Sequence, residues 1–321
     1  MTLTHSLRQW SRAADSRPVI AVALLMLLTV AVGLSVEQRY GSPNNLANVL
    51  EQSTALAIVA LGQMLVVAAG GIDLSVGALI GLGAVLTSGL IQGDPSKVWL
   101  VSFGVVALTT LVGAVNGLVI VWSRVHPLVV TLGTAAIATA VAQLYSLGPA
   151  GSVPDGFSGI AYARVAGVPA STVAMLATYV AVGWWLRSSV AGRHIVAVGD
   201  DVRAARLIGL PVHRLTMATY AASGFFCGLA SLYLVSRFGV GQPLTGAEYT
   251  LGSITPVVLG GTALGGGAVN VLGTCLAALL LSMLNNLLNF LDISTDYQYI
   301  VQGAVIIVAV TLYSKHEKGA A

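Results

Sequence analysis

The residues that could do chemistry in this chain are few, and the first of them lies in a long apolar run. Asp73 is the one ionisable residue between Ser53 and Gln92, within the stretch Gly-Gly-Ile-Asp-Leu-Ser-Val-Gly at 70–77. A carboxylate at the centre of a membrane helix costs about 2.5–3.5 kcal/mol on insertion scales, so it usually faces the interior of a bundle or a cavity. Three roles are open for Asp73: a helix cap, a ligand for a substrate hydroxyl, or a proton relay.

Neutral polar side chains recur in the later apolar runs. Amides donate and accept hydrogen bonds, so a path lined by amides and hydroxyls suits a neutral polyhydroxylated solute better than a charged one. The rival explanation is hydrogen bonding between neighbouring helices. The residues predicted to line a substrate path are Asp73, Ser75, Asn116, Asn285 and Asn286.

Patterns typical of enzymes are absent from the sequence. It contains no phosphate-binding loop, no H-E-x-x-H and no G-x-S-x-G. The five histidines are scattered without metal-ligand spacing, and Cys227 and Cys275 lie in apolar segments as packing residues do. We therefore expect no catalysis, no metal and no cofactor, and energy for any pumping would come from another subunit.

The composition describes a membrane protein. Only 8% of the 321 residues are charged and 56% are hydrophobic, whereas soluble domains carry roughly 25% charged residues. The net charge of +3 is too small to indicate nucleic acid. We predict one all-α domain over residues 1–321, a polytopic helical bundle with about ten transmembrane helices. The predicted spans are 19–36, 50–69, 74–92, 98–122, 128–147, 168–186, 214–235, 249–264, 269–290 and 297–313.

The distribution of Lys and Arg predicts the orientation of the bundle. If the N-terminus is inside and the chain crosses ten times, eleven of the basic residues lie inside and four outside. Cytoplasmic segments carry this excess of positive charge, so both termini, 1–18 and 314–321, are expected in the cytoplasm. The longest cytoplasmic segment is then 187–214.

Two glycine-rich stretches interrupt the apolar pattern. Glycine weakens helix propagation, and Asp73 or Ser75 can cap a new helix at Leu74. Such breaks at membrane depth are tolerated where protein or a water-filled cavity surrounds them, and repeated broken hairpins are typical of transporters. A simple flexible turn is the alternative. The predicted break residues are Gly70, Gly71, Gly260, Gly261 and Thr262.

The segment 187–214 contains the signals of a short helix. Asp200 or Asp201 can cap its start, while Gly209 and Pro211 can end it. Its alanines and its leucine could pack against a partner protein. A helix held at the membrane surface by arginines and lipid headgroups is the competing interpretation.

Four motifs in order make the chain resemble the ribose-type permeases of ABC sugar importers. They are the stretch 70–77, Asn116-Gly117 followed by His-Pro-Leu-Val-Val-Thr-Leu-Gly-Thr at 126–134, the segment 197–209, and Val-Val-Leu-Gly-Gly-Thr at 257–262 with the glycines that follow. The sequence departs from the pattern at 200–201, where Asp-Asp replaces a common Asn, and at 252–256, where an Asp is often found. It also has Leu128 where Phe is common.

The resemblance implies a permease of the bacterial inner membrane that works by alternating access. Implied partners are a second copy of the chain, an extracytoplasmic sugar-binding protein, a cytoplasmic ATPase and membrane lipid. The substrate would be a monosaccharide, a pentose or related small sugar; a stand-alone secondary carrier for a neutral solute is the alternative function. The residues implied to couple to the ATPase are Gly199, Asp200, Asp201, Ala204, Ala205 and Gly209.

Overall fold

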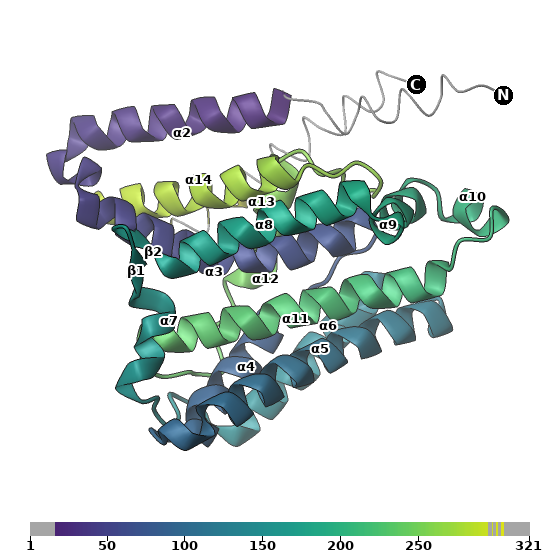
Figure 1. Cartoon of the computed structure of the whole chain (residues 1–321), viewed down its shortest axis with the longest axis horizontal. Coiled ribbons are helices and arrows are strands. Elements are labelled where there is room, and N and C mark those ends of the chain that lie inside the picture. Colours follow the sequence, from purple (N-terminus) through teal and green to yellow (C-terminus); the bar gives the residue numbers. More distant parts are fainter. Residues whose placement is uncertain (1–16, 295–296, 298–299, 301–302, 305–321) are drawn as a thin grey trace.

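The computed structural model describes residues 17–294, 297, 300 and 303–304. The predicted span 297–313 falls largely outside them, as do the tail 314–321 and most of 1–18. Within the described part the chain is a bundle of long, roughly parallel helices (Figure 1). Its longer helices are α2 (Arg17–Val36), α3 (Pro43–Ala68), α4 (Val76–Ile91), α5 (Val98–Ser123), α6 (Pro127–Tyr145), α8 (Ala170–Ser188), α11 (Val212–Phe238) and α14 (Val271–Phe290).

Short elements connect these helices. They are η1 (Gln38–Gly41), η2 (Pro95–Lys97), η3 (Asp155–Ser158), α7 (Gly159–Tyr162), β1 (Arg164–Val165), β2 (Val168–Pro169), α9 (Val190–Asp200), α10 (Val202–Leu207), α12 (Tyr249–Gly252) and α13 (Ile254–Leu259). The two strands form one antiparallel hairpin. The helix α7 and this hairpin lie at one end of the bundle, and α9 and α10 lie at the other (Figure 1).

Six of the described helices are long and apolar enough to cross a membrane: α2, α3, α5 with η2, α6, α11 and α14. α8 has the length but is less apolar, and α4 is shorter. A membrane-spanning helical bundle is therefore confirmed, whereas the count of ten crossings and the orientation of the termini stay predictions. The predicted span 249–264 is not a single helix in the structure, which divides it into the short helices α12 and α13.

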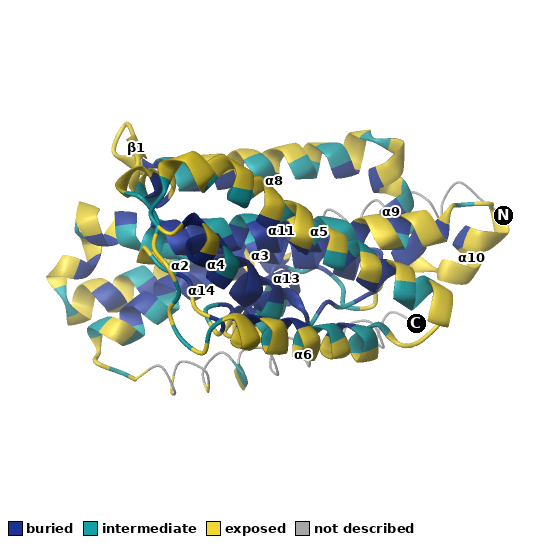
Figure 2. Cartoon of the chain, turned by 90° about the horizontal axis from the view of Figure 1, so that it is seen from below, coloured by how far each residue is buried: buried dark blue, intermediate teal, exposed yellow. Residues whose placement is uncertain are grey.

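Helix α3 is the centre of the core. It packs against α11, α14 and α8, and nearly all of its side chains from Ser53 to Ala68 are buried. By contrast α2, α5 and α6 expose wide apolar faces (Figure 2). Because buried helices pack densely, the break at the end of α3 is positioned by the helices that surround it.

Candidate functional site

The first glycine break turns the chain back alongside α3. Gly70 has φ +81°, a left-handed conformation that glycine adopts without strain. The amide of Gly70 donates to the Val67 carbonyl (2.9 Å) and that of Gly71 to the Val66 carbonyl (3.0 Å). A Cβ on Gly71 would lie 2.5 Å from the Tyr220 hydroxyl, so a larger residue there would displace the Tyr220 side chain. The chain turns at Gly70, where the sequence predicted a break, and α4 begins two residues later than predicted.

The Asp73 carboxylate lies at the centre of a buried set of hydrogen bonds. Its Oδ1 accepts from the Ser75 amide (2.9 Å) and the Ser75 hydroxyl (2.5 Å), and its Oδ2 accepts from the Ser223 hydroxyl of α11 (2.8 Å). The Asn116 amide of α5 donates to Ser75 Oγ (3.0 Å) and accepts from Thr134 Oγ1 of α6 (2.5 Å). The carboxylate is thus bonded directly to α11 and is linked through Ser75 and Asn116 to α5 and α6.

The backbone of Asp73 is held as well as its side chain. The side-chain amide of Gln63 on α3 bonds both backbone groups of Asp73 when its nitrogen and oxygen are oriented so that each has a partner. Its NH2 group donates to the Asp73 carbonyl (3.1 Å), and its oxygen accepts from the Asp73 backbone N–H (3.2 Å). The Tyr220 hydroxyl donates to the Ile72 carbonyl (3.3 Å). We call this set the Asp73 network: Gln63, Asp73, Ser75, Asn116, Thr134, Tyr220 and Ser223.

The centre of the network is closed to solvent. Asp73 and Ser75 have 0% exposure and Asn116 has 1%, so a solute cannot reach the carboxylate in this conformation. Asp73 bonds the amide that precedes α4 and therefore holds the turn before that helix. The roles of substrate ligand and proton relay remain predictions. The structure brings together three of the predicted path residues, Asp73, Ser75 and Asn116. Sequence analysis did not select Gln63, Thr134, Tyr220 and Ser223, because their residue types alone do not distinguish them from other buried polar residues.

The two predicted path residues on α14 lie elsewhere. Asn286 and Asn45 exchange reciprocal amide hydrogen bonds of 3.0 Å each, and Asn45 also donates to the Tyr40 carbonyl (2.8 Å). Asn45 begins α3 and Gln63 lies near its end, about 27 Å away at 1.5 Å per residue. Asn286 is therefore used in a helix–helix contact far from the Asp73 network, and Asn285 is half-buried beside it.

The Asn45–Asn286 pair gives a prediction about stability. Asn286→Ala should lower the free energy of unfolding by about 1–2 kcal/mol, because it leaves the buried Asn45 amide without its partner. The double variant with Asn45→Ala should cost less than the sum of the two single variants. Thermal denaturation of the detergent-purified protein measures this. Additive effects would show that the two amides do not interact.

The second glycine break brings α13 against α14. A Cβ on Gly260 would collide with the backbone of Gly273 and Thr274, and Gly261 has φ +90°. The Thr262 hydroxyl accepts from the Asn270 amide (3.1 Å) and closes the loop. Gly260 is thus required for close packing and Gly261 for the turn.

Both breaks contact the end of α9. Gly199 lies so close to α3 that an added Cβ would overlap the Ala68 carbonyl oxygen and stand 2.6 Å from the Gly267 amide. That amide donates to the same Ala68 carbonyl (3.2 Å). A Cβ on Gly266 would lie 2.6 Å from the Gly199 carbonyl oxygen. We call this contact of Ala68, Gly70, Gly199, Gly266 and Gly267 the glycine joint.

The segment 187–214 contains two helices where the sequence predicted one. Helix α9 was missed, although Ile195 and Val198 are spaced for its buried face. Asp201 caps α10 as predicted, accepting from the amides of Arg203 (2.7 Å) and Ala204 (3.0 Å). These hydrogen bonds lower the pKa of the Asp201 carboxyl, and the bond from the Ala204 amide has the larger effect.

The predicted coupling residues divide into two groups. Gly199 and Ala205 are buried, Gly199 in the glycine joint and Ala205 (2% exposed) against the end of α11. Asp200, Asp201, Ala204 and Gly209 are exposed. The side chains beside them form what we call the α10 surface: Arg203, Ala204, Arg206, Leu207 and Ile208. Leu207 is 89% exposed, so this surface is available to a partner.

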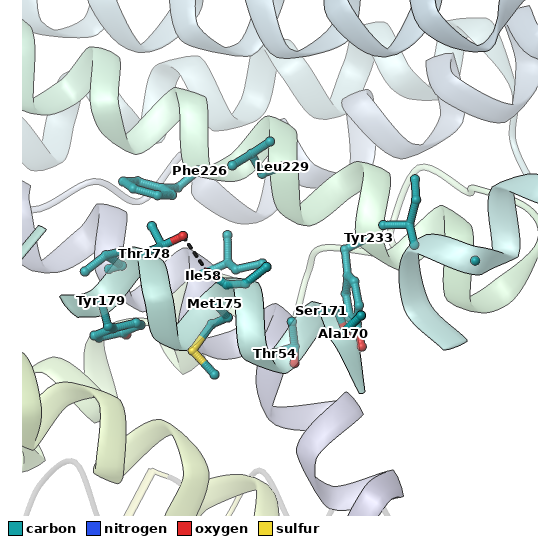
Figure 3. A pocket seen from close by; sticks show the side chains of 14 residues that line it. Thr54, Ile58, Ala170, Ser171, Met175, Thr178, Tyr179, Phe226, Leu229 and Tyr233 are labelled. Atoms are coloured by element: carbon teal, nitrogen blue, oxygen red, sulfur yellow. Dashed lines mark hydrogen bonds between the residues drawn. The ribbon is translucent and has the colours of Figure 1, made fainter. Parts of the chain in front are cut away.

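A pocket of about 370 Å³ lies between α3, α8 and α11 (Figure 3). Its lining is mainly apolar, with Ile58, Met175, Phe226 and Leu229 facing the space. None of the predicted site residues lines it. An apolar lining favours a hydrocarbon over a hydroxyl-rich solute, so this pocket is a poor candidate for a hydrophilic path.

Comparison with known proteins assigns the chain. Residues 45–310 match the family described as branched-chain amino acid transport system / permease component. The chain belongs to this family.

The permease is also similar to individual bacterial proteins over most of its length. It is 35% identical over 302 residues to the ribose import permease protein RbsC of Escherichia coli, covering 92% of this chain and 93% of that protein. It is 31% identical to the L-arabinose ABC transporter permease protein AraH of Azospirillum brasilense, with 90% and 85% covered. It is 30% identical to the D-allose transport system permease protein AlsC of Escherichia coli, with 90% and 89% covered.

These findings confirm the resemblance to ABC importer permeases and do not support a stand-alone carrier. The permease is a multi-pass protein of the bacterial inner membrane and a transport component rather than an enzyme. Membership of an ABC importer family implies an ATPase and a substrate-binding protein as partners.

Proposed function

We propose that this permease imports a monosaccharide, a pentose or related small sugar, through a path formed by two copies of the chain in a lipid bilayer. The observation that carries the proposal is the likeness, over nine-tenths of the chain, to proteins named for ribose, arabinose and allose. A binding protein delivers the sugar on the side of the β1–β2 hairpin. The ATPase binds the α10 surface on the cytoplasmic side.

The mechanism uses the contacts described above. ATP binding by the partner moves α10, and α9 follows because Asp201 joins the two helices directly. When α9 moves, Gly199 displaces both breaks, because its backbone is in direct contact with the backbone of Ala68 and Gly267. The Asp73 network holds α4 in register with α3, α5, α6 and α11, so the helices rock as units rather than separately.

Uptake in proteoliposomes tests the function. The permease is reconstituted with the ATPase and the binding protein encoded beside it, and labelled ribose, arabinose, allose and polyols are offered. We expect ATP-dependent uptake of one sugar that requires all three components. If the assembled complex hydrolyses ATP and moves none of the sugars, the substrate class is wrong.

Docking of the ATPase is tested separately. Leu207→Asp with Ile208→Asp should reduce the amount of ATPase that co-purifies at least about tenfold, because each buried leucine or isoleucine contributes about 1.5–3 kcal/mol to a contact. Val165→Asp, which changes an exposed apolar residue at the opposite end, is the control. Retention of the ATPase by the double variant would instead indicate that α10 lies on the membrane surface.

A further inference from the structure

The chain between α11 and α12 enters the bundle without forming a helix. After Gly239 ends α11, residues 240–248 form turns and make no regular helix or strand. At one end of this 240–248 segment, the Gly241 amide donates to the Ser88 hydroxyl (2.9 Å). At the other end the chain continues into α12, which lies near the middle of the bundle's length (Figure 1).

Glycines on α4 bring the 240–248 segment into backbone contact with that helix. A Cβ on Gly77 would lie 2.6 Å from the Gly246 carbonyl oxygen, and one on Gly81 would lie 3.0 Å from the Pro243 carbonyl carbon. From Ser88 to Gly77 the segment follows α4 for about 16 Å at 1.5 Å per residue. That is about half of a 30 Å hydrocarbon core.

The flank of the segment away from α4 is open in one copy of the chain. Leu244 and Leu251 are each 60% exposed, and the side chains of Gln242 and Glu248 are exposed as well. Non-helical backbone at membrane depth is tolerated where it is buried in protein or lines water, and it does not face lipid. Where no residue outside the described part of the chain covers it, the open flank faces either a second copy or a water-filled path.

The side chains on this flank favour water over a dry contact. Glu248 forms no direct ion pair within the described part of the chain. The Arg237 guanidinium is close enough to act on its charge, but it donates its hydrogen bond to Asn48 Oδ1 (3.3 Å). Sealing a carboxylate away from water without a direct ion pair would cost several kcal/mol. The Thr245 hydroxyl oxygen accepts from the Gln242 amide (3.2 Å), which leaves its proton free to donate.

We propose that Gln242, Thr245 and Glu248 line the substrate path and bind hydroxyl groups of the transported sugar. An amide, a hydroxyl and a carboxylate offer donors and acceptors within seven residues, and a polyol presents both. This proposal deepens the proposed function and rests on it. It assigns the sugar contact to a segment that sequence analysis did not select, in place of the buried Asp73 network.

Labelling of single cysteines tests whether water reaches the flank. In a background with Cys227→Ser and Cys275→Ser, Glu248→Cys and Gln242→Cys in the membrane-embedded complex are exposed to a negatively charged methanethiosulfonate reagent. We expect both to react, and the transported sugar to slow the reaction. Leu111→Cys, on the exposed apolar face of α5, is the control that should not react. Absence of labelling at both test positions would overturn the proposal.

Transport kinetics provide the second readout. Glu248→Gln and Gln242→Leu should raise the KM for the sugar at least about tenfold, while the co-purified ATPase is unchanged. Leucine at 242 removes the hydrogen bonds of the amide, and glutamine at 248 replaces a charged acceptor by a weaker neutral one. If both variants take up sugar at the wild-type rate and with the wild-type KM, the path assignment is refuted and the proposed function still stands. A wild-type complex that moves no sugar would instead refute the proposed function.

Discussion

Asp73→Ala is expected to leave little folded permease in the membrane, whereas Asp73→Asn should fold. Alanine removes the acceptor for the Ser75 amide, the Ser75 hydroxyl and the Ser223 hydroxyl. Each buried donor left without a partner costs about 1–3 kcal/mol, so the total loss is at least about 3 kcal/mol. Asparagine keeps one acceptor oxygen and can donate to Ser223, so its cost should stay near 1 kcal/mol.

Each permease variant is fused to a fluorescent protein, and its yield and melting temperature are measured by size-exclusion chromatography with fluorescence detection. Asp94→Ala is a matched control, because Asp94 accepts from the amide (2.9 Å) and hydroxyl (2.7 Å) of Ser96 in the same way but on the surface. That variant should melt close to wild type. A wild-type yield and melting temperature for Asp73→Ala would show that the network does not hold the fold.

Asp73→Asn also separates structure from transport. If it folds and transports normally, the negative charge is not needed and Asp73 serves to hold the turn before α4. If it folds, binds the ATPase and loses uptake, the charge acts in gating or on the substrate. The first result leaves only roles for Asp73 that need no charge, and the second shows that a helix cap alone does not explain the residue.

Gly199→Val is expected to abolish sugar uptake while the ATPase still binds. The added Cβ overlaps the Ala68 carbonyl oxygen, so α9 must move away from both breaks before any side chain can fit. Overpacking of this kind costs about 1–3 kcal/mol, and it separates α9 from the elements it should move. The α10 surface is untouched, because Leu207 and Ile208 point away from the joint and remain exposed.

Uptake and ATP hydrolysis are measured on the same preparation, together with the melting temperature. Gly104→Val is the control, since a Cβ on that exposed helical glycine meets nothing within 4 Å. We expect hydrolysis without transport for Gly199→Val and near-normal uptake for Gly104→Val. Normal coupled uptake by Gly199→Val would show that motion reaches the breaks by another route.

Local patterns predicted the break at Gly70 and the cap at Asp201 because both depend on residues that are close in sequence. The same logic failed for the span 249–264, since an apolar run does not reveal that its helix is interrupted at Ser253, between α12 and α13. Asn286 resembled a path residue because an amide in an apolar helix has the same signature whether it faces water or another amide. Its partner Asn45 lies 241 residues earlier.

The sequence by itself determined that this is an all-α membrane permease, that Asp73 is its exceptional carboxylate, and that glycines interrupt the helices at two places. These properties follow from composition, short-range propensity and ordered motifs, none of which requires a tertiary contact. Only the tertiary structure decided which groups satisfy Asp73, that α9 meets both breaks at Gly199, and that residues 240–248 enter the bundle as turns. Hydrogen-bond partners and backbone approaches join segments far apart along the chain, so they arise only when the helices pack.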